Sequence, residues 1–280
     1  MIMGITLAML FSHATGLAIM GFGFASLVAG PLMQILIAEY GLVENFVILA
    51  CIYAVVMTAS ALYLEPPKQE TAAGKGQFKA KMPEHVQYSV KEAMHTWQFY
   101  ALWWIFFTNI TCGIGLLAVA SPMAQEVIGM SPIAAASMVG IIGLLNGGGR
   151  IVWSTISDYI GRANTYLAFF VIEIVAFYLL GGVNESFMFQ LLVFIIITCY
   201  GGGFSCMPAY LSDLFGTKQL SAIHGRILTA WGLAGIAGPL LLSVIYERTH
   251  SYSFTLYFFS ACFVVSLLLA AVLKLKGKTA

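Results

Sequence analysis

One arginine deep in an apolar stretch is the side chain of this sequence best placed to do chemistry. Arg150 lies about eight residues inside the apolar run that ends at Asp158, Gly161 and Arg162, which places its guanidinium about 12 Å into hydrocarbon at 1.5 Å per helical residue. A charge at that depth is costly, and it is kept where it faces a bundle interior or a watery cavity, so the position favours an anion-binding site. The alternative is a cation that snorkels to the interface or pairs with a carboxylate elsewhere in the chain.

Two neighbouring features favour the anion-binding site. Asn146 stands one helical turn from Arg150, and Gly147, Gly148 and Gly149 are expected to leave helix backbone exposed between them. We therefore expect Arg150 to neutralise an anion and Asn146 to orient it.

The elements that must position Arg150 are membrane-spanning helices. The chain is 60% apolar and only 9% charged, with a mean hydropathy of +0.90, whereas about a quarter of a soluble domain is charged. An all-α polytopic membrane protein is therefore predicted. No basic stretch is interleaved with aromatic residues, so no nucleic-acid partner is expected. Eight spans are long enough to cross about 30 Å of hydrocarbon, at residues 14–38, 44–64, 98–121, 133–157, 164–182, 187–210, 224–246 and 253–274.

An internal repeat predicts how these spans are organised. Phe24–Leu32 (FASLVAGPL) is similar to Gly232–Leu240 (GLAGIAGPL), and a phenylalanine follows each proline at the same distance. The repeat unit is then six helices, a construction typical of secondary transporters. We divide the chain into residues 1–64, the last two helices of an N-terminal half, residues 65–97, a polar linker, and residues 98–280, a complete six-helix C-terminal half. Four further N-terminal helices are expected to be missing.

The basic residues predict the orientation of the chain in a cell membrane. Alternating the loops by side leaves only Arg248 on one face and puts ten cations on the other, which are Lys68, Lys75, Lys79, Lys81, Lys91, Arg162, Lys218, Lys274, Lys276 and Lys278. By the positive-inside rule the linker and the C-terminus are cytoplasmic. Arg150 and Arg226 are the two cations that this rule does not explain. Arg226, with His224 beside it, is a candidate cytoplasmic gate or an interfacial anchor.

A short turn carries the second candidate motif. Asp158, Gly161 and Arg162 form the pattern S-D-x-x-G-R in a turn predicted to be cytoplasmic. A carboxylate at the end of its own helix opposes the helix dipole, so we expect Asp158 to face the start of another helix, near Ala14 to Gly16, or the Arg162 side chain.

Three stretches, which begin at Asn146 (NGGGRIVWSTISDYIGR), Tyr200 (YGGGFSCMPAYLSDLFGTK) and Ile223 (IHGRILTAWGLAGIAGPL), resemble the oxalate/formate antiporter family of the major facilitator superfamily. The resemblance implies that the eight spans correspond to helices five to twelve of a twelve-helix carrier, and that Arg150 matches an arginine that contacts the substrate carboxylate. The family also uses a lysine on its eleventh helix, and residues 221–246 contain none. A monocarboxylate therefore fits the single deep cation better than a dicarboxylate does.

The remaining candidates have a structural alternative each. Tyr200, Phe204 and Trp231 are expected to form aromatic walls around the substrate, or to be ordinary packing residues. Glu173 is interpreted as a structural carboxyl, with proton coupling as the alternative. The five cysteines lie in apolar spans without C-x-x-C spacing, so neither metal nor disulfide is expected, and no cofactor motif is found. The function predicted is transport of a small mono- or dicarboxylate by alternating access, without enzymatic chemistry. The alternative is a non-transporting sensor, an assembly subunit or an inactive fragment, with the missing helices or a second subunit as partner.

Overall fold

The computed structural model describes residues 35–63 and 87–276, together with residues 21, 25, 28, 29, 32 and 33. These residues form helices and short turns and no strand, as the all-α prediction required. Seven of the described helices are long and apolar enough to cross a membrane, which confirms a polytopic helical protein. The first predicted span, 14–38, and the site expected for Asp158 near Ala14 to Gly16 lie largely or wholly outside the described residues.

The chain forms two compact units, Ala25–Met82 and a larger unit that combines Met1–Phe24 with Pro83–Ala280. In the smaller unit, helix α2 (Leu42–Tyr63) follows a turn at Gly41, where φ is +96°. Its mostly apolar side chains are exposed over nearly the whole length, since only Asn45 and Leu49 are buried. A helix that is apolar all round is suited to a lipid environment or to the interior of a larger bundle.

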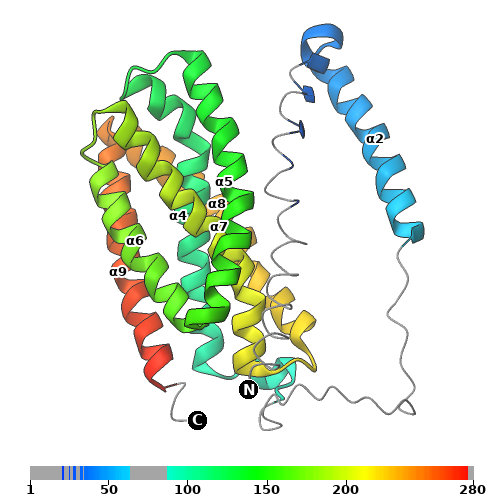
Figure 1. Cartoon of the computed structure of the whole chain (residues 1–280), viewed down its shortest axis with the longest axis vertical. Helices are drawn as coiled ribbons and strands as arrows, with labels where there is room; N and C mark the ends of the chain where they lie inside the picture. Colours follow the sequence, from blue (N-terminus) through cyan, green and yellow to red (C-terminus); the bar gives the residue numbers. More distant parts are fainter. Residues whose placement is uncertain are drawn as a thin grey trace. The chain divides into compact units, whose positions relative to one another are not determined.

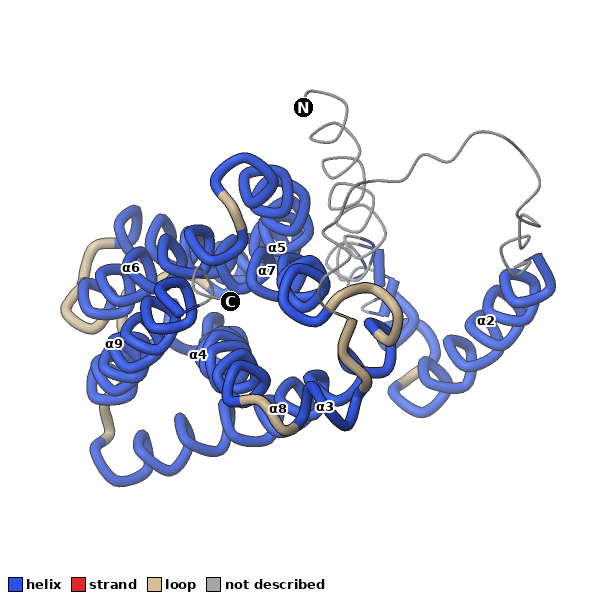
Figure 2. Tube along the Cα trace, turned by 90° about the horizontal axis from the view of Figure 1, so that it is seen from below, coloured by secondary structure: helices blue, strands red, loops and turns tan. Residues whose placement is uncertain are grey.

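The larger unit is a helical bundle in which distant segments pack in pairs (Figure 1). Figure 2 shows the bundle from below, with α5 beside α7, α4 beside α8 and α6 beside α9. Helices α4 and α7 are the most deeply buried, whereas α5 and α8 present broad exposed faces. The helices are α3 (Val90–Met94), α4 (Trp97–Glu126), α5 (Pro132–Ile160), α6 (Arg162–Leu180), α7 (Ser186–Phe215), α8 (Leu220–Thr249) and α9 (Tyr252–Lys276).

Polar caps begin three of these helices within one residue of the predicted starts, and the same helices run three to five residues beyond the predicted ends. Thr96, Ser131 and Glu185 accept hydrogen bonds from the first free N–H groups of α4, α5 and α7. Each of α4, α7 and α8 has 30 residues, which corresponds to about 45 Å of helix, the thickness of a bilayer with its headgroups.

Glycines bring α5 and α7 into close contact. A Cβ atom at Gly201 would lie 2.4 Å from the carbonyl oxygen of Asn146, and one at Gly149 would lie 2.7 Å from the carbonyl oxygen of Thr198. Inside a membrane the hydrophobic effect does not drive helices together, and small residues of this kind let helix backbones approach closely enough to pack. Gly149 and Gly201 are therefore packing residues of the contact between α5 and α7.

The segment that precedes α4 is fixed to the turn between α7 and α8. The backbone N–H of Tyr88 donates to the carbonyl of Phe215, and the N–H of Lys218 donates to the Gln87 side chain at 2.9 Å. In return the N–H of Val90 donates to the Gln219 side chain at 2.8 Å. We call residues 87–96 the strap. A capping box at its helix α3 lets the backbone and side chain of Ser89 hold the pKa of the Glu92 carboxyl below its usual value.

Candidate anion-binding site

Arg150 lies in α5 with its side chain fully buried, at 0% exposure. Its Nε donates a long hydrogen bond of 3.5 Å to Oδ1 of Asn146, one turn earlier on the same helix. The guanidinium carbon lies 5.0 Å from the ring centroid of Phe204 on α7, within the range of a cation–π interaction. The structure therefore brings together three of the residues that the sequence predicted for this site.

Phe204 connects the arginine to two further helices. Its ring lies 5.8 Å from that of Phe106 on α4 and 6.3 Å from that of Trp231 on α8, measured between centroids. Trp231 is 39% exposed. The aromatic group thus runs from the buried cation to the exposed face of α8, and two of the three predicted aromatic residues belong to it.

Tyr200 has a different position from the other two aromatics. Its ring fills the space above Gly113 of α4, where an added Cβ would meet the ring at 2.2 Å, and the side chain is buried. Tyr200 therefore packs α7 against α4.

The backbone beside Arg150 is less open than the sequence suggested. Gly147 and Gly149 are buried, and α7 covers Gly149 at Thr198, so the expected exposure is wrong for both residues. Only Gly148 faces open space, with nothing within 4 Å of an added Cβ. The reason is that the glycines serve the close α5–α7 contact. The Ser205 hydroxyl confirms this proximity by donating to the Arg150 carbonyl at 3.0 Å.

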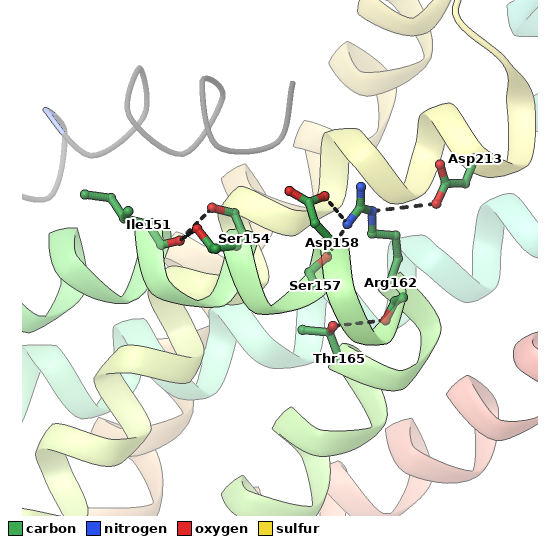
Figure 3. Close-up of polar contacts among 9 residues, drawn as sticks. Ile151, Ser154, Ser157, Asp158, Arg162, Thr165 and Asp213 are labelled. Carbon is green, nitrogen blue, oxygen red and sulfur yellow. Dashed lines mark hydrogen bonds and ion pairs between the residues drawn. The ribbon is translucent and has the colours of Figure 1, made fainter. Parts of the chain in front are cut away.

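A second polar group lies at the ends of α5 and α7 (Figure 3). Arg162 Nη1 lies 2.5 Å from a carboxylate oxygen of Asp158, as expected for this pair, and also donates to Ser157 at 2.9 Å. Arg162 Nε lies 3.7 Å from the Asp213 carboxylate. The Asp158 side chain is only 1% exposed, whereas that of Asp213 is 48% exposed. One arginine is thus placed between a buried and a half-exposed acid.

Sequence reasoning missed Asp213, although the sequence contained a signal for it. The pattern S-D-x-x-G occurs at Ser157–Gly161 and again at Ser212–Gly216. Each glycine ends its helix with a positive φ, 86° at Gly161 and 81° at Gly216, and its N–H donates to the carbonyl of the serine four residues earlier. Glycine is favoured there because a side chain disfavours this backbone conformation. Two identical helix ends therefore place the two acids near one arginine.

Arg226 does not join either group. It is exposed near the start of α8, and no ion pair connects it to another residue in the described part of the chain. His224 beside it is half-buried. The gate and the interfacial anchor both stay predictions for Arg226.

Glu173 lies in α6 and is fully buried. Its carboxylate accepts from the Asn109 side chain of α4, and no ion pair joins it to a basic residue within the described ranges. The contact connects two helices, which is the role expected of a structural carboxyl. Among the described residues there is also no group of three His, Cys, Asp or Glu side chains that could hold a metal ion.

The sequence matches the Major Facilitator Superfamily over residues 2–239 and 149–279. It is 28% identical to the uncharacterized MFS-type transporter YhjX of Escherichia coli (strain K12), over 78% of this chain and 54% of that protein. It is 27% identical to the oxalate:formate antiporter of Oxalobacter formigenes, over 80% of this chain and 53% of that protein. The chain thus spans about half the length of these curated relatives, and its match to the family model covers most of its residues. This chain belongs to the Major Facilitator Superfamily.

Proposed function

We propose that this chain forms the anion-binding half of a secondary transporter that moves small carboxylates by alternating access. The observation that supports this most directly is the full burial of Arg150 in a helix of a membrane protein. Burial of a charge in hydrocarbon costs free energy, and an apolar side chain could fill the same space at a lower cost. A buried cation in a membrane helix therefore favours a functional role. An anionic substrate is the partner that would move with the transport cycle.

The geometry around Arg150 suits a carboxylate. A guanidinium offers a planar pair of donors that matches the two oxygens of a carboxylate. Asn146 holds the Nε side of the guanidinium, so it fixes the direction of the fork. The ring of Phe204 under the guanidinium excludes water and strengthens the electrostatic contact. We assign Arg150 to charge neutralisation, Asn146 to orientation and Phe204 with Trp231 to the wall.

We further propose a monocarboxylate as the substrate class. Helix α8 contains no lysine and its one arginine near the start, Arg226, is exposed. A second carboxylate of a dicarboxylate would therefore lack a cation from this unit. The oxalate:formate antiporter among the relatives is named for one substrate of each kind, which makes formate and oxalate the natural pair to compare.

The site needs a second membrane half to enclose it. Trp231 is exposed at the end of the aromatic group, and the relatives are about twice as long as the matched region. Carriers of this kind bind substrate between two repeated halves that rock around it. We therefore propose that further N-terminal helices, or a second subunit, cover the face of α8 that carries Trp231.

Counterflow of labelled formate and oxalate in proteoliposomes tests this function, with the chain supplied alone and with a complementing four-helix segment. We expect formate flux only in the complemented form. Arg150→Gln should lower formate affinity about 30-fold or more, as expected for a desolvated charge pair. Arg150→Lys should keep part of the affinity, because it keeps the charge and loses the fork.

Arg226→Gln is the matched control, since it removes an exposed cation and should leave formate affinity nearly unchanged. Unaltered formate transport by Arg150→Gln would refute the assignment of the site. Absence of flux from the complemented wild-type chain, with formate binding that depends on Arg150, would favour a non-transporting sensor.

A further inference from the structure

A cavity of about 230 Å³ lies at the end of the bundle farthest from the strap, the upper end in Figure 1. It is formed where α4, α6 and α8 end and α9 begins. Its polar lining includes Glu126, Asn184, His250 and Ser251, and no lysine or arginine lines it. The cavity is separate from Arg150 and from the acids beside Arg162, so neither group accounts for it.

The carboxylate of Glu126 is the charged group of this cavity. The hydroxyls of Tyr246 and Tyr252 both donate to its Oε2, at 3.2 and 3.1 Å, and the two tyrosine rings stack with centroids 4.3 Å apart. Tyrosines at the end of a membrane helix are often interfacial anchors that point to headgroups. Here both hydroxyls converge on one oxygen, which leaves Oε1 without a hydrogen bond from the described residues.

The helix ends add negative potential to the same place. The carbonyl groups in the last turns of α4, α6 and α8 have no further N–H partners in their own helices, and they carry the negative end of each helix dipole. At the opposing start of α9, the N–H of Ser253 is already engaged by the Ser251 hydroxyl at 3.2 Å. The starts of α7 and α9 also border the cavity and offset part of this potential, so the attraction for a cation comes mainly from the Glu126 carboxylate, which has only neutral hydrogen-bond donors.

We propose that this cavity binds a small organic ammonium ion, and we call it the Glu126 site. The free Oε1 of Glu126 accepts an ammonium N–H, and the lone pairs of the two tyrosine oxygens and the Asn184 amide oxygen are further acceptors within the lining. The cavity is much larger than a bare metal ion requires, and the described residues place no three acidic, His or Cys side chains together. An alkyl chain next to the ammonium group fills the space beside Leu180 and Leu256, which also line the cavity.

Titration of the whole 280-residue chain in non-ionic detergent with propylammonium chloride tests the Glu126 site, with propanol and sodium chloride as parallel titrants. We expect saturable binding of propylammonium, seen by calorimetry and as a rise in unfolding temperature, and no saturable response to propanol or sodium. Glu126→Gln keeps the shape of the side chain and should weaken binding about tenfold or more, because it removes a charged acceptor.

Glu247→Gln is the matched control, because Glu247 is an exposed acid like Glu126, is adjacent to Tyr246 on α8, and does not line the cavity. The affinity of this variant for propylammonium should stay within about twofold of the wild type, because the charge that it removes lies outside the cavity. The proposal is overturned if Glu126→Gln binds propylammonium as the wild type does, if Glu247→Gln weakens binding equally, or if sodium binds with the same dependence on Glu126.

Discussion

The side-chain nitrogen of Asn109 lies 3.1 Å from one carboxylate oxygen of Glu173 and 3.3 Å from the other, and both side chains are fully buried between α4 and α6. One neutral amide thus supplies the hydrogen bonds that this acid receives from the described residues. Removing one partner of a buried polar pair leaves the other without its hydrogen bond, whereas replacing both by apolar residues avoids that cost.

Asn109→Leu should therefore lower the free energy of unfolding by about 1 to 3 kcal/mol. The double variant Asn109→Leu, Glu173→Leu should recover part of that loss, and Glu173→Gln should cost less than Asn109→Leu because it can still hydrogen-bond. Thermal or denaturant unfolding of the purified chain in detergent measures all three, together with Glu173→Leu alone. If the double variant is as unstable as the sum of its single changes, the two residues do not act as a pair.

The contact between α5 and α7 can be tested with two glycines. Gly201→Ala places a methyl group 2.4 Å from a backbone carbonyl of α5, so it should separate the helices and cost about 1 to 3 kcal/mol of stability. Gly148→Ala puts the same group into open space and should be neutral or stabilising, since alanine favours helix over glycine by about 1 kcal/mol. Equal unfolding temperatures for the two variants would show that the contact is looser than the structure indicates.

Arg162 should matter more than Asp213 at the ends of α5 and α7. Arg162→Gln leaves the buried carboxylate of Asp158 without its cation, and losses of about 3 kcal/mol are typical when a buried pair is broken. Asp213→Asn removes a half-exposed partner at 3.7 Å and should cost at most about 1 kcal/mol. Unfolding in detergent distinguishes them, and a larger loss for Asp213→Asn would reverse the roles assigned here.

The orientation in the membrane is a prediction from the division of basic residues, and labelling tests it. A cysteine in place of exposed Asn184, in the turn after α6, should react with an impermeant thiol reagent in intact cells, whereas one in place of exposed Thr217, in the turn after α7, should not. Both positions lie in short turns of similar exposure, so accessibility alone does not separate them. Labelling of Thr217→Cys but not Asn184→Cys would invert the proposed topology.

Seven of the eight predicted spans correspond to described helices, because a stretch of about 20 apolar residues without charges has few stable structures other than a membrane helix. The helix ends were less predictable. The starts of α4 and α5 lie within one residue of the predicted starts, whereas α4 and α7 each end five residues beyond the predicted ends. These helices continue through polar residues such as Gln125 and Asp213, which apolar windows exclude.

The candidate site was predictable where a single residue carried the signal. The burial of Arg150 followed from the cost of its charge at depth, and the contact with Asn146 followed from helical spacing. The position of Tyr200 against Gly113 depends on which faces of α4 and α7 meet, and no local pattern contains that information. Asp213 does carry a local signal in the repeated S-D-x-x-G pattern, but its partner Arg162 lies 51 residues earlier and becomes near only when α5 packs on α7.

The strap gives the polypeptide before α4 two attachments to the larger unit. The strap leads directly into α4, yet its hydrogen bonds join it to the residues around Phe215 and Gln219, more than 120 positions later in the chain. A force applied to the chain ahead of Gln87 is consequently divided between the start of α4 and the start of α8. Helices α4 and α8 also pack along each other. The strap therefore connects the same end of both helices, and a load on it acts on both together.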